Sequence, residues 1–403
     1  MTKPELTDFT LASFNVKNLI GPDQEYYQFQ SYTPEEYAWK RDWMADQMLS
    51  LDADVIGFQE IFEESALRDV IREANLRADE LNKTTIPDRS KRYHRKAIFR
   101  KLAVEPWDMR HVAFAPNVND GTPGHRRPGL AVLSRFGFVG TPEVVQELPE
   151  PLSIPFTEGG GHFTLTRLSR PILKVRIPVG DQVITLFNCH LKSKLGEFIR
   201  PEGTDFAPEQ DLTNYDPVSR ALGSARAAMR RMAEAWVLRK LVVEEINAGN
   251  PVVVLGDFND GEHAVSSEII SGEVPFKNYA WMLRHDAKTP RDRYSEAESV
   301  KITEEIDAVR LHSAEKLFVR KSLRDMVYTA SFGGVFESID QIFLSRAFHP
   351  DYENRIADMT YFSVLNDHIT DGSHPEAPYN KLASDHGQIM AHLTLRSGKA
   401  RAK

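Results

Sequence analysis

The chain has 403 residues, of which 41% are hydrophobic and 27% are charged, and its formal net charge is −8. This is the composition of a globular protein long enough for a large core, and the acidic balance excludes a general coat of positive charge for binding nucleic acid. A local basic cleft would still allow an acidic protein to act on nucleic acid.

The cysteine content and the N-terminus limit the compartment. The one cysteine, Cys189, excludes an intrachain disulfide, and we expect it to be a buried small apolar residue. The N-terminal stretch lacks a basic segment followed by an apolar one, and no run of 18 apolar residues occurs. We therefore expect a cytoplasmic protein without a membrane anchor, or a secreted one if a leader has been removed. No feature indicates a protein partner.

Seven short apolar runs predict buried strands, because their length and β-branched content favour strand over helix. They cover residues 11–16, 54–60, 129–134, 182–190, 251–260, 338–345 and 386–395. Residues 33–49 predict a helix, since Thr33-Pro34-Glu35-Glu36 is typical of a capping box with proline in the first turn. Residues 221–247 predict a second helix that ends before Gly249-Asn250-Pro251. Its expected inner face holds Ala225, Ala228, Met232, Ala235, Val242 and Ile246.

The segments between these elements predict loops and no linker. Residues 117–128 and 149–161 are rich in proline, glycine and charge, and residues 196–218 are irregular and charged. Residues 284–326 are mixed and include some helix, and residues 397–403 predict a frayed tail. We expect one domain over residues 1–403 with a core at about 9–395, of the α/β (α+β) class, with sheets inside and helices outside.

Polar residues stand at the ends of the predicted strands. They are Asn15, Glu60, His190, Asp257, Asn259, Asp340, Asp385 and His386. Side chains alternate along a strand, so Asp257 and Asn259 share a face. Carboxylate and amide oxygens suit a hard cation such as Mg²⁺. The absence of CxxC and HExxH disfavours zinc, and the absence of GxxxxGK[ST] and GxSxG disfavours P-loop and elbow-type serine enzymes.

Six motifs in order carry a family resemblance. FNVKNL, DVIGFQE, HLKSK, LGDFND, SIDQIFLS and SDHGQI resemble the endonuclease/exonuclease/phosphatase superfamily, which has the DNase I-like fold. The runs HLKSK, SARAAMRR and YTASFGGVFESIDQIFLS resemble its bacterial nuclease branch. The resemblance covers about residues 9–395. It implies a four-layer sandwich of two packed mixed β-sheets flanked by helices, with the active site at one edge.

The resemblance also implies a metal site. Glu60 would be the principal ligand of Mg²⁺ or Mn²⁺, Asn15 would orient Glu60 or contact the metal's water shell, and Asp385 would be a second acidic ligand. The simpler structural alternatives are a solvated acid after a strand for Glu60 and an Asx turn for Asn15. One metal ion and possibly a second are expected.

Catalytic roles follow from the same resemblance. Asp257 would orient or deprotonate the attacking water, and Asn259 would donate to a phosphate oxygen. Asp340 would accept the imidazole N–H of His386 and favour the protonated ring. His190 would donate to the phosphate or protonate the leaving oxygen. The alternatives are a β-turn for the first pair and a strand-end histidine for His190.

Several cations are candidates for binding substrate phosphates. Lys192 follows His190, Arg226 lies in the predicted second helix, and Arg126 and Arg127 lie in a loop near the expected cleft. A structural ion pair is the alternative for Arg226, and a solvated loop charge is the alternative for Arg126 and Arg127.

We therefore predict a Mg²⁺- or Mn²⁺-dependent phosphodiester hydrolase, a nuclease that cleaves DNA or RNA by in-line attack of water. The alternatives are a phosphatase or phosphodiesterase acting on a small phosphoester or phospholipid head group, and an inactive scaffold of the same fold. Trp107, Trp281 and Phe276 are scattered and do not form an aromatic cluster for membrane contact. The long insertions at 195–218 and 262–327 could restrict the substrate to single strands, short oligomers or a small molecule.

Overall fold

A computed structural model describes residues 7–27, 30–83, 104–117, 126–154, 163–199, 207, 210–272, 294–319, 327–370, 380 and 382–396. Its strands form two six-stranded sheets and a separate hairpin. The first sheet has the order β13 (Ala357–Leu365), β14 (Gln388–Leu395), β1 (Asp8–Leu19), β2 (Val55–Ile61), β4 (Arg127–Ser134) and β3 (Val112–Asn117). The second has the order β5 (Glu143–Ile154), β6 (Phe163–Val179), β7 (Gln182–His190), β8 (Val252–Asp257), β12 (Asp340–Ser345) and β9 (Leu311–Ser313). The hairpin pairs β10 (Ala330–Phe332) with β11 (Val335–Glu337).

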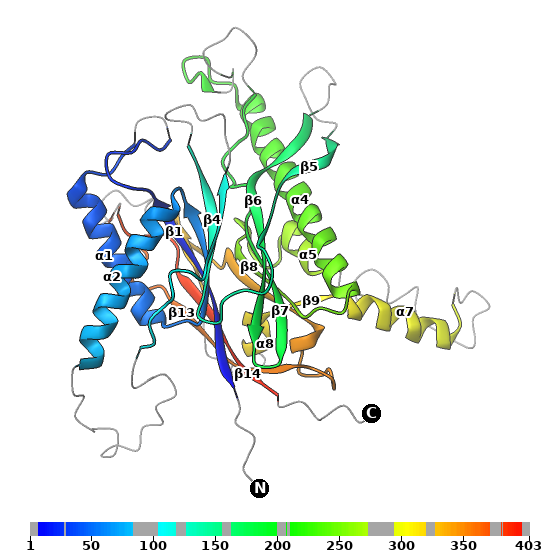
Figure 1. Cartoon of the computed structure of the whole chain (residues 1–403). Helices are drawn as coiled ribbons and strands as arrows, with labels where there is room; N and C mark the ends of the chain where they lie inside the picture. Colours follow the sequence, from blue (N-terminus) through cyan, green and yellow to red (C-terminus); the bar gives the residue numbers. More distant parts are fainter. Residues whose placement is uncertain are drawn as a thin grey trace.

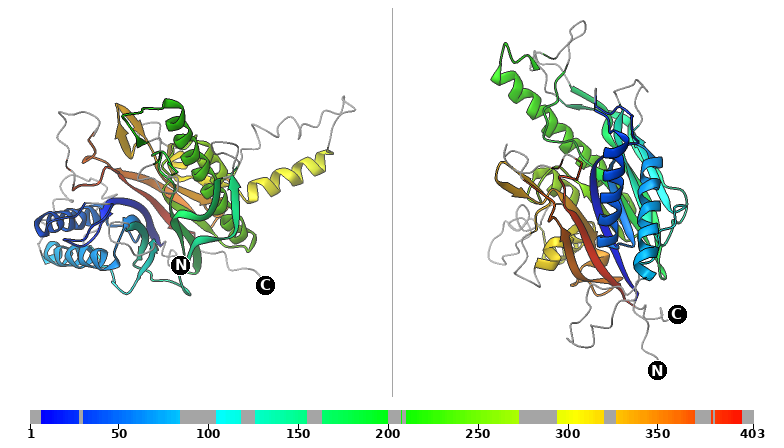
Figure 2. Two further views of the ribbon diagram at one scale, coloured as in Figure 1. Left: turned by 90° about the horizontal axis from the view of Figure 1, so that it is seen from above. Right: turned by 90° about the vertical axis from the view of Figure 1, so that its left-hand side faces the viewer.

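The helices cover the outer faces of the sheets. They are α1 (Pro34–Leu51), α2 (Glu64–Lys83), α4 (Pro217–Asn247), α5 (Val265–Ser271), α7 (Glu296–Ala308), α8 (Ala314–Val319) and the 3₁₀ turn η3 (Arg346–Phe348). Figure 1 shows α1 and α2 beside the first sheet and α4 and α5 beside the second, and Figure 2 shows the same layers from two other directions. The predicted four-layer sandwich is confirmed.

Alternation along the strands produces the layers. On β1, Leu11 faces the core between the two sheets, whereas Ala12 and Phe14 face the cluster under α1. On the second sheet, Leu186 faces the same inner core and Phe187 faces the cluster under α4. A fully buried side chain of this kind contributes about 1.5–3 kcal/mol. The inner core therefore holds the two sheets face to face.

All seven predicted strands and both predicted helices are present. The capping box of α1 is confirmed, because Thr33 Oγ1 accepts from Glu36 N at 3.2 Å and Thr33 N donates to the Glu36 carboxylate at 3.1 Å. Cys189 is buried, as expected. The charged segment 284–326 includes helix, since α7 and α8 lie within it.

Several boundaries were wrong. The segment 149–161 was expected to be a loop, but β5 continues to Ile154 by pairing with β6, and 155–162 lie outside the described residues. The second helix starts earlier than expected, because Asp216 caps it by accepting from the backbone N–H groups of Val218 and Ser219. On its inner face Ala235 and Val242 are buried, while the other four expected residues are half-buried.

Other expectations fall outside the described part of the chain. These are the tail 397–403, residues 118–125 of one loop, residues 200–206 and 208–209 of the first insertion, and residues 273–293 and 320–326 of the second. Trp281 and Phe276 lie in that second insertion. Within the described ranges, no helix combines the length and apolar character needed to cross a membrane.

The strand directions create one polar edge. β1 and β2 run parallel, as do β7 and β8, so their carboxyl ends meet at the same edge of the sandwich. β12 is antiparallel to β8 and β14 is antiparallel to β1, so both begin at that edge. The polar residues predicted at strand ends are therefore brought together.

Candidate active site

The carboxylate of Asp257 is the centre of the polar edge. It is 1% exposed at the end of β8. Its Oδ2 lies 2.9 Å from Asn15 Nδ2, 3.3 Å from His190 Nε2 and 3.8 Å from His386 Nε2. Asn15 and His386 come from the first sheet's edge and His190 from the second sheet, so this carboxylate joins the two sheets at the site.

Gly256 permits this placement. Its φ is 142°, and a Cβ there would collide with the backbone carbonyl of Cys189 on β7. Only glycine allows such a close approach of two backbones. As a result Asp257 stands directly beside His190 in the β7–β8 register and beside Asp340 in the β8–β12 register.

Asp340 and His386 form the predicted pair. His386 Nδ1 lies 2.8 Å from Asp340 Oδ2. Thr329 Oγ1 accepts from the backbone N–H of Asp340 at 3.0 Å. Ser384 Oγ accepts from His386 N at 3.0 Å and donates to the carbonyl of Asn15 at 2.6 Å. Both members of the pair are thus fixed through their backbones.

Glu60 is held by the end of β1. Its Oε1 accepts from Asn15 Nδ2 at 3.4 Å and its Oε2 accepts from Asn18 N at 3.0 Å. The φ angles of Lys17, Asn18 and Glu60 are 54°, 59° and 66°, in the left-handed region that non-glycine residues rarely adopt. This backbone turns both segments toward the polar edge. Asn15 is therefore in position to orient Glu60, and that expected role stays a prediction.

Asp385 lies at the rim of the site. Half of its side chain is exposed, and its Oδ2 lies 3.7 Å from Lys17 Nζ. It follows Ser384 in the segment pinned to β1 and precedes His386. Its expected role as a second acidic ligand stays a prediction.

Burial and neighbouring charges fix the protonation of the cluster. Burial raises the pKa of Asp257 to about 7, with His386 opposing and Asp340 adding to the shift. Burial lowers the pKa of His386, but Asp340 and Asp257 outweigh it and hold the pKa well above its usual value. Burial, together with Arg170 and His386, holds the pKa of His190 well below its usual value. The site thus pairs a charged imidazole with a neutral one.

Asn259 is engaged with the protein. Its backbone has φ 54°, its N–H donates to Asp257 Oδ1 at 2.7 Å, and its Nδ2 donates to the carbonyl of Leu191 at 3.0 Å. It thereby orients Asp257 and closes the end of β7. Its contact with a phosphate oxygen stays a prediction.

The predicted phosphate-binding cations differ in exposure and in the contacts that their side chains already make. Lys192 Nζ donates to the carbonyl of Leu195 at 2.7 Å, and burial lowers its pKa to about 8. Arg226 lies on α4 and is only 3% exposed. Arg127 is exposed at the start of β4, whereas Arg126 is bound to Glu63 at 3.0 Å. An ion pair thus occupies the Arg126 side chain.

Arg170 and Tyr27 also adjoin the site, although neither was predicted. Arg170, on β6, donates to the carbonyl of Leu191 at 3.3 Å, and its charge helps to lower the pKa values of His190 and Lys192. Burial and the nearby Glu60 raise the pKa of Tyr27 to about 12, against Arg170. β6 was not predicted as a strand and Tyr27 lies outside regular structure, so no motif marked either residue.

Helix α4 supports the site with buried charge. Glu234 is 2% exposed and accepts from the backbone N–H groups of Ser169 at 2.7 Å and Lys192 at 2.8 Å. Arg231 donates to Asp260 at 2.6 Å and to the carbonyl of Lys192 at 3.1 Å. These contacts fix β6 at Ser169, the segment that follows His190, and the loop that follows Asp257.

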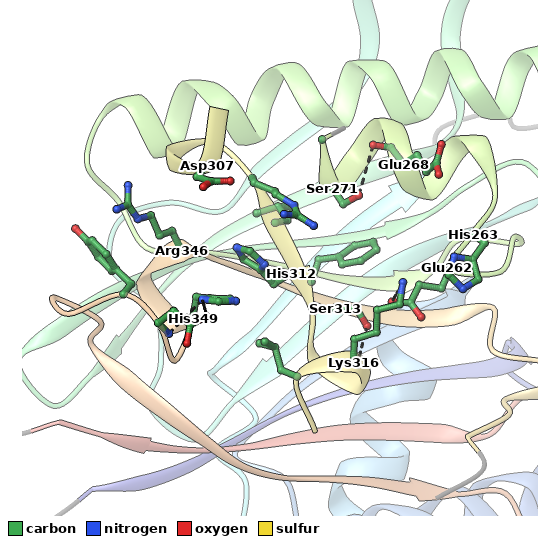
Figure 3. A pocket seen from close by; sticks show the side chains of 17 residues that line it. Glu262, His263, Glu268, Ser271, Asp307, His312, Ser313, Lys316, Arg346 and His349 are labelled. Atoms are coloured by element: carbon green, nitrogen blue, oxygen red, sulfur yellow. Dashed lines mark hydrogen bonds and ion pairs between the residues drawn. The ribbon is translucent and has the colours of Figure 1, made fainter. Parts of the chain in front are cut away.

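A separate cavity of about 590 Å³ lies between α5, β9 and η3. Figure 3 shows His312, His349 and Arg346 on one side of it and Glu262 with Lys316 on another. The rings of His312 and His349 lie 4.1 Å apart. None of the residues in the Asp257 cluster lines this cavity.

The sequence model of the Endonuclease/Exonuclease/phosphatase family matches residues 12–386. The chain belongs to this family. Its members are hydrolases that act on phosphoester bonds and generally use divalent metal ions. Asp257, Asp340 and His386 present ligand atoms within 4.8 Å of one another, as a metal-binding group would.

Solved structures resemble this chain at low identity. An endonuclease/exonuclease/phosphatase from Bacteroides vulgatus is 13% identical, with 97% of this chain and 100% of that chain covered and a TM-score of 0.47. A functionally unknown conserved protein from Enterococcus faecalis V583 is 13% identical (96% and 100% covered, TM-score 0.45), and TDP2 from Caenorhabditis elegans is 13% identical (98% and 76% covered, TM-score 0.41). No curated protein matches this chain.

Proposed function

We propose that this chain is a Mg²⁺- or Mn²⁺-dependent phosphodiesterase whose substrate is DNA or RNA. The observation that carries the proposal is the convergence on Asp257 Oδ2 of nitrogen atoms from Asn15, His190 and His386, each within 3.8 Å. A carboxylate with nitrogen atoms on three sides, one of them from a histidine–aspartate pair, suits attack of water on phosphorus.

Each residue has a distinct task in this proposal. Asp257 orients the attacking water and takes its proton, which its raised pKa favours. His386, held charged by Asp340, stabilises the charge that grows on the phosphoryl oxygens. His190 is neutral and donates a hydrogen bond to the leaving oxygen.

The oxygen atoms around Glu60 fit a hard divalent cation. Asn18 Oδ1 is buried and has no hydrogen-bond partner in the described part of the chain, although the N–H of the same residue binds Glu60. An unpartnered amide oxygen on a residue whose backbone binds a carboxylate is suited to Mg²⁺ or Mn²⁺. Glu60 would hold the ion, with Asp385 as a further ligand. When bound, the ion neutralises phosphate charge.

Local cations support a nucleic-acid substrate despite the net charge of −8. Arg170 and Arg127 lie close enough to Tyr27 to oppose the rise in its pKa that burial and the charge of Glu60 cause. Lys17 Nζ lies 3.7 Å from Asp385 Oδ2 at the rim of the site. These cations flank the cluster and can contact the phosphates next to the one that reacts.

A substrate panel with Mg²⁺ and with Mn²⁺ tests the proposal. It includes plasmid, single-stranded DNA, RNA, bis(p-nitrophenyl) phosphate, an inositol phosphate and sphingomyelin vesicles. We expect cleavage of DNA or RNA whose KM rises steeply with salt, since phosphate contacts release counterions. Hydrolysis confined to sphingomyelin or inositol phosphate would overturn the nuclease assignment in favour of a lipid or small phosphoester.

A further inference from the structure

The β10–β11 hairpin is an apolar projection next to the candidate active site. It directly precedes β12, which begins at Asp340, and stands away from both sheets (Figure 2). Phe332 is 74% exposed, Val335 is 56% exposed and Phe336 is 57% exposed. Large apolar side chains grouped at a protein surface mark a binding surface more often than scattered ones do.

The hairpin is apolar on both faces. Phe332 pairs with Val335, and Ser331 pairs with Phe336. Because side chains of adjacent positions point to opposite faces, Phe332 and Val335 share one face and Phe336 lies on the other. The Phe336 ring contacts Tyr328 edge-on at 4.9 Å. A hairpin that only packed against its own protein would need one apolar face.

The hairpin is fixed to the catalytic groups. Thr329, which precedes β10, accepts from the backbone N–H of Asp340 and from that of Ile339, both at 3.0 Å. Its carbonyl accepts from the N–H of Gly387, which follows His386, at 2.8 Å. Phe336 is four residues before Asp340, so the chain keeps them within about 14 Å. This distance is comparable to the span of a few nucleotides.

Positive charge adjoins one face of the hairpin. Lys194 Nζ lies 2.9 Å from Glu337 Oε2. In the hairpin register Glu337 shares its face with Phe332 and Val335. That face is therefore turned toward the segment that follows His190 and carries Lys192 and Lys194.

We propose that the exposed rings of Phe332 and Phe336 stack on unpaired bases of the substrate and make this enzyme prefer single-stranded nucleic acid. The inference rests on the proposed function and names its substrate class. Aromatic rings beside a cationic groove bind single strands by stacking on bases while cations contact phosphates. Paired bases do not offer a free face to such rings, so duplexes are poorer substrates.

The adjoining cations favour nucleic acid over a lipid surface as the occupant. Lys194 contacts the hairpin on the Phe332 face, and it follows His190 in the same segment as Lys192. A strand bound to the reacting centre places bases next to phosphates, which matches rings next to cations. A membrane-binding hairpin would contact lipid through its apolar side chains, and its removal would not change the preference for a substrate with bases.

The test compares two oligomers of the same length and phosphate count. One is a single-stranded DNA 12-mer and the other is an abasic 12-mer, which has no bases to stack. The readout is the ratio of their kcat/KM values with Mg²⁺, for wild type, Phe332→Ala, Phe336→Ala and the double variant. Leu76→Ala is the control, because Leu76 is 56% exposed on the outer part of α2. A duplex 12-mer and vesicles of phosphatidylcholine and phosphatidylserine complete the set.

We expect wild type and Leu76→Ala to prefer the base-bearing 12-mer by about 10-fold or more, and the double variant to bring the ratio close to one. A wild-type ratio near one, with both oligomers cleaved, would overturn the inference and leave the proposed nuclease activity standing. If wild type cleaves neither oligomer but hydrolyses bis(p-nitrophenyl) phosphate, the proposed function fails first. If the double variant loses vesicle binding but keeps the wild-type ratio of kcat/KM values, the inference is overturned in favour of a membrane.

Discussion

His386 and Asp340 are 46 residues apart in the chain, and the imidazole Nδ1 lies 2.8 Å from the carboxylate. The carboxylate stabilises the charged ring and leaves its Nε2 facing Asp257 at 3.8 Å. This arrangement makes the two residues one functional unit.

A double-mutant cycle measures that unit. We expect Asp340→Asn and His386→Ala each to lower kcat by about 10²–10⁴-fold. The double variant should be little worse than His386→Ala alone, because the carboxylate acts through the ring. Rate losses that multiply in the double variant would show that the two residues act independently.

Asp257→Asn should lower kcat by about 10³-fold or more, because the amide cannot take a proton from water. Stability should be unchanged or higher, since burial raises the pKa of this carboxyl and the amide avoids the cost of a buried charge. Steady-state kinetics and thermal unfolding give the two readouts. Asp351→Asn, at a side chain that is 82% exposed, is the matched control. Near-normal turnover of Asp257→Asn would remove Asp257 from the mechanism.

Metal removal tests the site at Glu60. EDTA should abolish activity, and added Mg²⁺ or Mn²⁺ should restore it. Glu60→Gln should raise the metal concentration for half-maximal activity about 10-fold or more, because the amide has lost the ligand's charge. Calorimetric titration of the apoprotein checks this without turnover. Glu147→Gln, at a 75% exposed side chain, should titrate as wild type, and hydrolysis that persists in chelator would exclude a metal requirement.

Lys40 links two segments of the candidate active site. It is fully buried on α1, and its Nζ donates to the carbonyls of Val16 at 2.9 Å and Leu382 at 3.0 Å. Burial lowers its pKa to about 7, with Lys17 adding to the shift and Glu60 and Asp385 opposing it. It therefore joins the end of β1 to the segment that carries His386.

This lysine gives stability a defined dependence on pH. The unfolded chain holds the proton up to about pH 10.5 and the folded chain only up to about pH 7. Unfolding between these values takes up a proton, so stability rises with pH by at most about 1.4 kcal/mol per unit. We expect urea unfolding at pH 7, 8 and 9 to favour wild type over Lys40→Met increasingly. Lys301→Met, at a 76% exposed side chain, should give a slope of stability against pH equal to that of wild type. An equal slope for Lys40→Met would refute the lowered pKa of Lys40.

Asn188 joins the two sheets through polar contacts in a fully buried position. Its Nδ2 donates to the carbonyls of Phe58 at 3.0 Å and Ala131 at 2.9 Å, and its Oδ1 accepts from Gln59 at 2.7 Å. Asn188→Ala leaves these groups buried and unpaired, so we expect a loss of about 2–4 kcal/mol in the free energy of unfolding. Ser50→Ala, on the exposed side of α1, is the control, and a loss below that of the control would contradict the account.

The sequence was most informative where periodicity and strand ends coincided. The runs ending in Asn15, His190 and Asp257 predicted both their strands and their convergence, because strand direction alone brings such ends to one edge. It was least informative where tertiary contacts decide structure. Arg170 lies on β6, whose alternation is interrupted by Pro171, before the residues that pair with β7. It enters the site through its hydrogen bond to the carbonyl of Leu191.

Local sequence periodicity also did not predict which polar residues are buried or which aromatic residues are exposed. Glu234 and Arg231 lie on the inner face of α4, where apolar residues were expected, because their partners are backbone groups of distant loops. Phe332 and Phe336 are ordinary strand residues in sequence. Their rings are exposed only because the hairpin is separate from both sheets.

The position of β14 has a consequence for biosynthesis. This strand enters the first sheet between β13 and β1, and it is made long after the β1 residues with which it pairs. Until it emerges from the ribosome, His386 is missing and β1 has an open edge. On the proposed mechanism, a growing polypeptide therefore has no hydrolytic activity until β14 has paired in the sheet.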